Sequence, residues 1–138
     1  MSGRHVVLVG MKTGTVYRRI PTAPSPFSIE RVGDVAVVAH TVTGRVTVLE
    51  RHEIDGFAEP RYTAAAHDGR HAFVSDSGDA RLVAIDVVRG TIVGHVRLSQ
   101  WPRHVSLAPD GRTLWVRGTC STKTRLELHL DSSPASRN

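Results

Sequence analysis

The sequence predicts an all-β protein built from repeated four-stranded units, and three observations support this class. Twelve short runs rich in Val, Ile, Leu, Thr and aromatic residues are separated by Gly, Asp and Pro, a pattern typical of strands and turns. No window keeps apolar residues at helical spacing. Residues 59–74 (EPRYTAAAHDGRHAFV) return 42 positions later at 101–116 (WPRHVSLAPDGRTLWV), with seven of sixteen positions identical. A period of about 40 residues containing four strands is typical of β-propeller blades.

The expected strands follow one another along the whole chain. They are residues 6–10, 15–20, 27–32, 35–40, 45–50, 62–66, 71–76, 81–86, 91–98, 104–108, 113–118 and 125–130. Tight turns join them. In LAPDGRTLWV, Pro109 fixes φ, Asp110 can hydrogen-bond its own backbone, and Gly111 tolerates the left-handed conformation. Asp68-Gly69 forms the same turn in the other copy without the proline.

The repeat divides the chain into blades. Residues 6–20 match residues 82–96 at an offset of 76, so the opening segment is expected to form the third and fourth strands of a blade. The expected parts are a half blade at 5–20, a blade at 22–58, a blade at 59–98, an incomplete blade at 101–131 and a disordered tail at 132–138. The fourth strand of the first blade, before Pro60, is expected to be reduced or missing. The prediction is therefore a partial β-propeller over residues 1–131, with about three four-stranded antiparallel blades, that starts and ends in mid-blade.

Closure is the physical problem of such a chain, because a propeller needs roughly 4 to 8 blades and an open array leaves unpaired strand edges. Three solutions stay open. The chain is a shortened form of a longer propeller, which we favour, or two partial rings self-associate through their open edges, or an open array is tolerated.

Composition indicates one folded domain. The chain has 138 residues, 40% of them hydrophobic and 22% charged, which are globular values. The net charge of +5 comes from scattered arginines and not from a basic stripe, so no nucleic-acid partner is expected. The opening apolar run is too short for a signal peptide or a membrane span, so no membrane association is expected and a cytoplasmic location is the default. The single cysteine, Cys120, lies in a polar run typical of an incidental loop thiol.

Motifs that could carry chemistry are incomplete. GMKTGTV lacks the Gly-Lys-Ser/Thr ending of a phosphate loop, and His52-Glu53 lacks the second His of a zinc protease. Asp76 and Asp79 supply too few oxygen ligands for a calcium loop. The histidines share no spacing that would converge on a metal, and no Gly-x-Ser-x-Gly elbow occurs. We therefore expect no complete catalytic set, no metal and no cofactor.

The repeat unit, made of PRHVSLAPDGRTLWV and LVAIDVVRGTIVGHVRL, resembles that of the YVTN-type β-propeller proteins. This group includes lactonase-like and surface-layer-like members, many from high-GC bacteria, and the resemblance covers residues 15–131. In such propellers the first strand of every blade lines a central channel, and ligands bind at one mouth. The resemblance therefore implies a candidate ligand-binding set at that mouth: Arg61, Tyr62, Arg103 and His104, with His40 and Asp76 at equivalent positions of the other loop.

This set has two interpretations. Two guanidiniums and an imidazole could bind a carboxylate or phosphate, because Arg offers a rigid bidentate fork and His transfers protons near neutral pH. Alternatively, Pro suits the start of the strand and Arg bridges neighbouring blades, so that the Pro-Arg pair is a structural joint. We favour the joint for the pair. His104, which stands where the other copy has Tyr62, is the stronger individual candidate for a ligand contact.

The functional interpretations belong to different classes. The first is a non-enzymatic scaffold whose channel mouth or blade edge binds a small molecule or another protein. The alternative is a fragment of a lactonase-like hydrolase, for which the resemblance implies hydrolysis of a sugar lactone, with Arg103 and His104 in positioning and proton transfer. A redox-cofactor propeller is the third, and it would need haem ligands or a quinone cradle that the sequence does not show.

Overall fold

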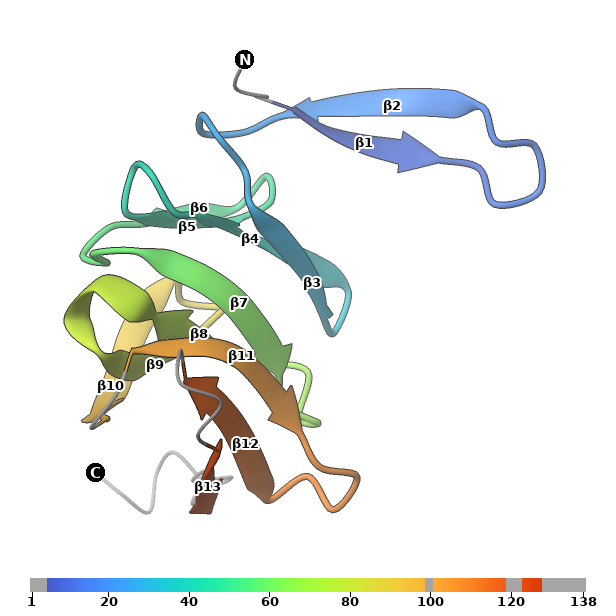
Figure 1. Ribbon diagram of the computed structural model, residues 1–138. Helices are drawn as coiled ribbons and strands as arrows, with labels where there is room; N and C mark the ends of the chain where they lie inside the picture. Colours follow the sequence, from blue (N-terminus) through green and yellow to red (C-terminus); the bar gives the residue numbers. More distant parts are fainter. Residues whose placement is uncertain (1–4, 99–100, 119–122, 128–138) are drawn as a thin grey trace.

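The computed structural model describes residues 5–98, 101–118 and 123–127. Within them the chain forms four antiparallel sheets that follow one another along an arc (Figure 1). The predicted fold class is confirmed, since these all-β sheets are consistent with propeller blades. The helix in the described part is a 3₁₀ turn, η1 (Ser77–Asp79), and no helix there is long and apolar enough to cross a membrane.

Each sheet consists of consecutive strands joined by turns. The half blade pairs β1 (His5–Val9) with β2 (Val16–Pro21). Blade 1 has the order β3 (Ser28–Val32), β4 (Val35–His40), β5 (Arg45–Val48) and β6 (His52–Ile54). Blade 2 contains β7 (Pro60–Ala65), β8 (His71–Asp76), β9 (Arg81–Asp86) and β10 (Thr91–Arg97). Blade 3 contains β11 (Pro102–Leu107), β12 (Thr113–Gly118) and β13 (Lys123–Glu127).

Strand β6 is the fourth strand that the sequence predicts to be reduced or missing, and it is present with three residues. It pairs with β5, placing Ile54 opposite Val46, and Ile54 is buried. A strand of three residues shows too little alternation to be recognised from a pattern. Cys120, the end of the last expected strand (128–130) and the expected tail at 132–138 lie outside the described residues.

Apolar faces of successive sheets form the core, because alternate residues of a strand point to opposite faces. We call the face toward the preceding sheet the front face and the face toward the following sheet the back face. The cluster between blades 1 and 2 contains Val32, Val37, Val46, Val48, Ile54 and Phe57 against Ala72, Val74, Val83, Ile85, Val87 and Ile92. Blades 2 and 3 pack through Ala64, Ala66, Phe73 and Leu82 against Leu114 and Val116. The half blade packs on blade 1 through Val6, Leu8 and Ile20 against Ala36, Val38 and Leu49.

Blades 1 and 2 also approach closely at their turns. Gly33 has a φ of 61°, and a Cβ added there would lie 2.6 Å from the carbonyl oxygen of Gly69. Both the left-handed backbone and the lack of space require glycine at this position.

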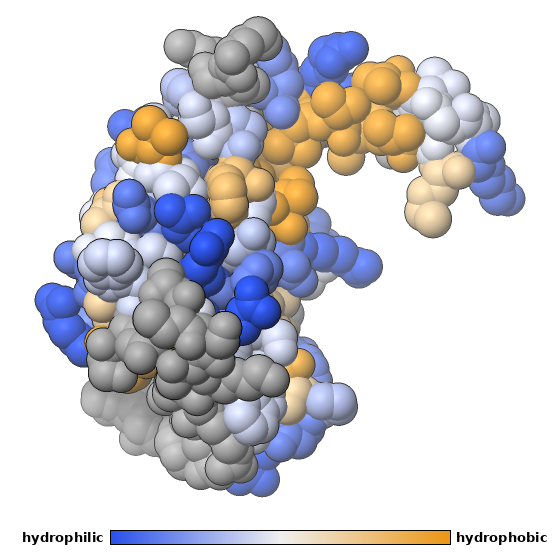
Figure 2. All heavy atoms as spheres, viewed as in Figure 1, coloured by the Kyte–Doolittle hydropathy of each residue, from blue (hydrophilic) through white to orange (hydrophobic). Residues whose placement is uncertain are grey.

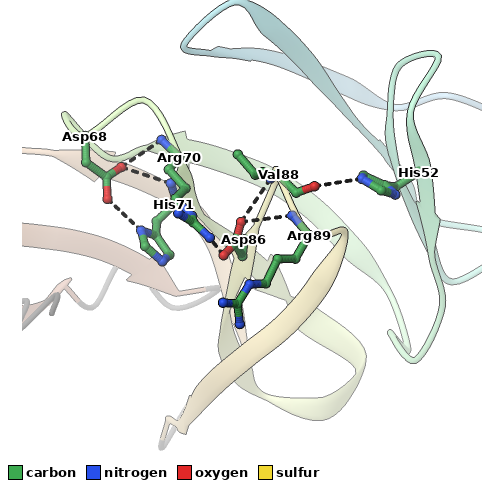
Figure 3. Close-up of polar contacts among 7 residues, drawn as sticks. All are labelled: His52, Asp68, Arg70, His71, Asp86, Val88 and Arg89. Atoms are coloured by element: carbon green, nitrogen blue, oxygen red, sulfur yellow. Dashed lines mark hydrogen bonds and ion pairs between the residues drawn. The ribbon is translucent and has the colours of Figure 1, made fainter. Parts of the chain in front are cut away.

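Aspartates hold the turns of blade 2 at the end of the sheet opposite to the start of β7 (Figure 3). Asp68 Oδ1 accepts hydrogen bonds from the N–H groups of Arg70 and His71, both at 2.9 Å, and Oδ2 lies 2.6 Å from His71 Nδ1. Burial alone would raise the pKa of Asp68, but the bonds from His71 and Arg70 outweigh it and lower that pKa. Asp86 accepts a bond from Arg70 Nε at 3.0 Å and one from the N–H of Val88 at 2.9 Å. These carboxylates are therefore structural.

Candidate functional site

The first strands of the blades, β3, β7 and β11, lie beside one another along the arc (Figure 1). Two serine hydroxyls join successive blades at these strands: Ser28 Oγ of β3 donates to the carbonyl of Arg61, and Ser75 Oγ of β8 donates to the carbonyl of Arg103 at 2.7 Å. The main chain at the starts of β7 and β11 is therefore fixed by the preceding blade.

The repeated Pro-Arg pair makes a second recurring contact through its proline carbonyl. Thr41 Oγ1, which follows the second strand of blade 1, donates to the carbonyl of Pro60 at 2.7 Å. Ser77 Oγ, which follows the second strand of blade 2, donates in the same way to the carbonyl of Pro102. Both prolines are buried. The main chain of the Pro-Arg pair is thus a joint between blades, whereas its arginine side chain is left to point elsewhere.

Both arginine side chains of the repeat line one pocket of about 470 Å³. Its lining residues come from the starts of β7 and β11 and from η1: Glu59, Arg61, Ser77, Gly78, Trp101 and Arg103. Arg61 Nη2 lies 4.0 Å from Glu59 Oε1, and Arg61 Cζ lies 5.7 Å from the ring centroid of Phe27. Among the described residues, no carboxylate lies within ion-pair distance of Arg103, whose side chain is exposed. Arg61 thus has a carboxylate and an aromatic ring beside it, whereas Arg103 is available to a ligand.

Trp101 and Glu59 are pocket residues that the sequence-based set does not include. Trp101 is 61% exposed and stands directly before Pro102, as Glu59 stands before Pro60. The repeat offset of 42 places the two at the same position of successive blades. The repeat could have identified both residues from the sequence, because each stands two positions before the mouth arginine of its own blade.

Tyr62 and His104 lie in an aromatic row along the first strands, outside the pocket of the two arginines. Phe27 meets Tyr62 edge-on, with ring centroids 5.4 Å apart, and Tyr62 stacks on His104 with centroids 4.2 Å apart and planes 23° apart. Such contacts add about 0.5–1.5 kcal/mol per aromatic pair beyond area burial. His104 borders a second pocket of about 500 Å³, together with Trp115 and Arg117.

His40 is fully buried at the end of β4, with 0% of its surface exposed. Its Nε2 lies 2.9 Å from Thr47 Oγ1 and 3.3 Å from Thr22 Oγ1, while Nδ1 lies 3.2 Å from the carbonyl oxygen of Pro24. Burial lowers the pKa of His40 and outweighs the Pro24 carbonyl, which raises it. The imidazole is therefore a neutral internal link, and it does not reach the pocket.

Asp76 is also fully buried, at the end of β8. Its carboxylate accepts hydrogen bonds from the N–H of Ala58 at 3.0 Å, from the N–H of Glu59 at 2.6 Å and from Arg81 Nε at 3.1 Å. Asp76, which directly precedes η1, thus fixes the segment that carries Glu59. Asp76 lies behind the pocket wall and shapes it without facing the solvent.

Within 5–98, 101–118 and 123–127, no group of three or more His, Cys, Asp or Glu side chains is arranged to hold a metal ion. The chemical resources of the pocket are two guanidiniums, one carboxylate, one hydroxyl and an indole. This set favours binding of an anion that carries an apolar or planar portion.

Comparison with known proteins supports the fold. No family model and no curated protein matches this chain. Among solved structures, the chain is similar to hydrazine synthase of Kuenenia stuttgartiensis, with a TM-score of 0.82 and 23% identity over 91% of this chain. The chain spans 40% of the length of that chain. The matched protein contains β-propeller domains, so the likeness shows a β-propeller-like fold, and at this identity it shows the fold alone.

Proposed function

We propose that this chain is a non-enzymatic β-propeller scaffold that binds an anionic group, a carboxylate or phosphate of a small molecule or protein, at the mouth pocket. The observation that carries the proposal is the convergence of Arg61 and Arg103, from equivalent positions of adjacent blades, on one pocket that contains a single described carboxylate. The repeat unit around these arginines also supports assignment to the YVTN-type propeller group.

The physical basis is the guanidinium chemistry. An arginine presents paired N–H donors that match the two oxygens of a carboxylate or phosphate, and such charge-assisted bonds are about twice as strong as neutral ones. The pocket main chain is fixed by the inter-blade bonds to Pro60 and Pro102, so the side chains of Arg61 and Arg103 extend from fixed main-chain positions. Trp101 offers an exposed indole face beside them. An anion attached to a planar group would use all three side chains.

The lactonase-like alternative receives less support from the geometry. Its proton-transfer residue, His104, would have to act in the pocket that holds the substrate. His104 instead stacks on Tyr62 and borders the second pocket, whereas Arg103 lines the first. The two residues therefore serve different pockets, which favours binding over hydrolysis.

The proposal is tested by calorimetric titration of the chain with citrate, a compact polycarboxylate. We expect 1:1 binding that weakens with rising salt, because ions screen exposed charges. Arg103→Ala should weaken binding by about 10- to 100-fold, since hydrogen bonds to charged groups contribute about 1.5–3 kcal/mol. Arg103→Lys should recover only part of this loss, because lysine keeps the charge without the fork.

Arg112→Ala is the matched control. Arg112 is exposed in the Asp110–Thr113 turn at the other end of blade 3, and its loss removes one positive charge without touching the pocket. The control should bind citrate as the unmodified chain does. Equal weakening by Arg103→Ala and Arg112→Ala would show that citrate senses net charge alone, and the proposed site would be abandoned.

A further inference from the structure

The half blade exposes a valine patch whose counterparts inside the arc are buried. Val7, Val9 and Val16 are 38%, 48% and 43% exposed on the front face of the half blade. Shifting by the repeat offset of 76 gives Val83, Ile85 and Ile92 in blade 2. Val83 and Ile85 are 0% exposed, and all three belong to the cluster between blades 1 and 2. The patch therefore has the chemistry of a blade interface without a blade against it in the described residues. Apolar residues gather on the half blade in the space-filling view (Figure 2).

The opposite end of the arc repeats this situation on the back face of blade 3. Trp115 is 43% exposed, whereas Phe73, its counterpart at an offset of 42, is 4% exposed within the cluster between blades 2 and 3. A third exposed residue, Ile29 (53%), lies on the front face of blade 1 opposite Val38. In the described residues the half blade has only β1 and β2, so nothing covers Ile29 as inner strands would.

Among the described strands, the incomplete sheets at the two ends of the arc are complementary. By the repeat, β1 and β2 match β9 and β10, the third and fourth strands of a blade, and β11 and β12 match β7 and β8, the first and second strands. Among the described strands, β1 pairs on one edge only, with β2. We infer that a second copy of this chain pairs with the half blade: β11 and β12 of one copy join β1 and β2 of the other in a single four-stranded hybrid blade.

The hybrid blade has a defined register. In blade 2, Val74 pairs with Val83 and Ala72 pairs with Ile85. The same offsets place Val116 of one copy opposite Val7 of the other, and Leu114 opposite Val9. Each of these pairs joins a front-face residue of blade 3 to a front-face residue of the half blade, so the apolar faces are continuous.

Both faces of the hybrid blade would then be covered. On its back face, Trp115 of one copy packs on Ile29 of the other, as Phe73 packs on blade 3 within the chain. On its front face, the valine patch extends the apolar surface over the outer part of blade 2, where Leu82 and Leu98 belong to the cluster with blade 3. The exchange buries the exposed valines, Ile29 and Trp115 together.

Counting blades fixes the number of copies. Of its described strands, each chain brings β1 to β12 to the assembly, and these twelve make three blades. Two copies give six blades, within the roughly 4 to 8 of closed propellers, whereas three copies would give nine. In the single chain β13 occupies the edge of β12 that β1 would take, so β13 competes with the exchange.

The first test is sedimentation of the full chain over a range of concentrations. We expect a reversible equilibrium between one and two chains. Val7→Asp with Val9→Asp should abolish the dimer without lowering the melting temperature of the monomer, because both side chains are exposed in the single chain. Val42→Asp, an 81% exposed turn residue, is the matched control and should dimerise normally. Equal behaviour of the patch variant and the control would overturn the inference.

The second test weakens the pairing of β13 with β12, which competes with dimerisation. Thr124→Pro with Arg125→Pro deletes the N–H groups of two consecutive β13 residues, and alternate N–H groups point to the same neighbour, so at least one bond to β12 is lost. Dimerisation should tighten at least tenfold. In a Trp101→Phe background, where Trp115 is the sole tryptophan, its emission should shift to shorter wavelength on dimerisation. A proline variant that stays monomeric, or one that grows beyond two chains, contradicts the closed hybrid ring.

Discussion

Asp76 is the residue whose removal best tests how the mouth pocket is built. Its fully buried carboxylate accepts two main-chain N–H groups, from Ala58 and Glu59, and the guanidinium of Arg81. Asp76→Ala leaves all three donors without this acceptor. The side chain of Arg81 is only 12% exposed, so its lost partner is poorly replaced by water.

The magnitude follows from these contacts. A buried donor left unsatisfied costs about 1–3 kcal/mol, and breaking a buried ion pair by removing one partner costs about 3–5 kcal/mol. We expect Asp76→Ala to lower the free energy of unfolding by about 3–5 kcal/mol. For a domain of this size the melting temperature should fall by about 10–20 °C. Because domains have about 5–15 kcal/mol in total, the variant should remain partly folded.

The assay is urea unfolding followed by tryptophan fluorescence and circular dichroism. Asp79→Ala is the control, since Asp79 is 47% exposed and only 3.6 Å from the same Arg81 Nε. An exposed pair contributes about 0–1 kcal/mol, so the control should unfold almost as the unmodified chain does. A loss below about 1 kcal/mol for Asp76→Ala would refute the argument that this carboxylate anchors the segment before β7.

Further predictions concern pH and backbone geometry. Burial lowers the pKa of His40 below its unfolded value near 6.5, so the contribution of neutral His40 to stability is complete above about pH 6.5 and is lost as the pH falls below that value. His40→Gln should therefore flatten the pH dependence of the melting temperature between about pH 7 and pH 5. An unchanged slope would contradict this prediction. Both Gly33 and Gly14 have positive φ, but only Gly33 faces the carbonyl oxygen of Gly69. Gly33→Ala should therefore lower the free energy of unfolding in urea by at least about 1 kcal/mol more than Gly14→Ala does. Equal losses of stability in the two variants would show that the blades can separate at this turn.

The fold class could be predicted because the repeat carries it. The Asp-Gly turns at Asp68 and Asp110 and the β-branched runs between them appear twice at nearly constant spacing. Such local signals fix strands and turns without knowledge of tertiary contacts. Strand β6 is the reduced form of the fourth strand that the sequence predicts to be reduced or missing. Its exact bounds could not be predicted, because three residues carry no readable alternation and its position depends on pairing with β5.

The candidate site was harder to predict, because a sequence position does not reveal the direction of a side chain. Arg61 and Arg103 do meet in one pocket, while their prolines form the structural joint, so the two interpretations of the Pro-Arg pair apply to different atoms. His40 and Asp76 occupy the expected loop positions, but their side chains turn inward to satisfy main-chain and hydroxyl groups. Burial of that kind depends on the neighbouring segments and not on the motif itself.

We propose that anions bind at the mouth formed by the starts of β7 and β11. The most direct measurement is a titration of the ¹⁵N-labelled chain with citrate, followed by amide chemical shifts in nuclear magnetic resonance spectra. We expect the shifts to concentrate at residues 58–61, 76–78 and 101–104, around Arg61 and Arg103. Shifts concentrated at the opposite turns, around Asp68 and Asp110, or spread over all surface arginines, would contradict it.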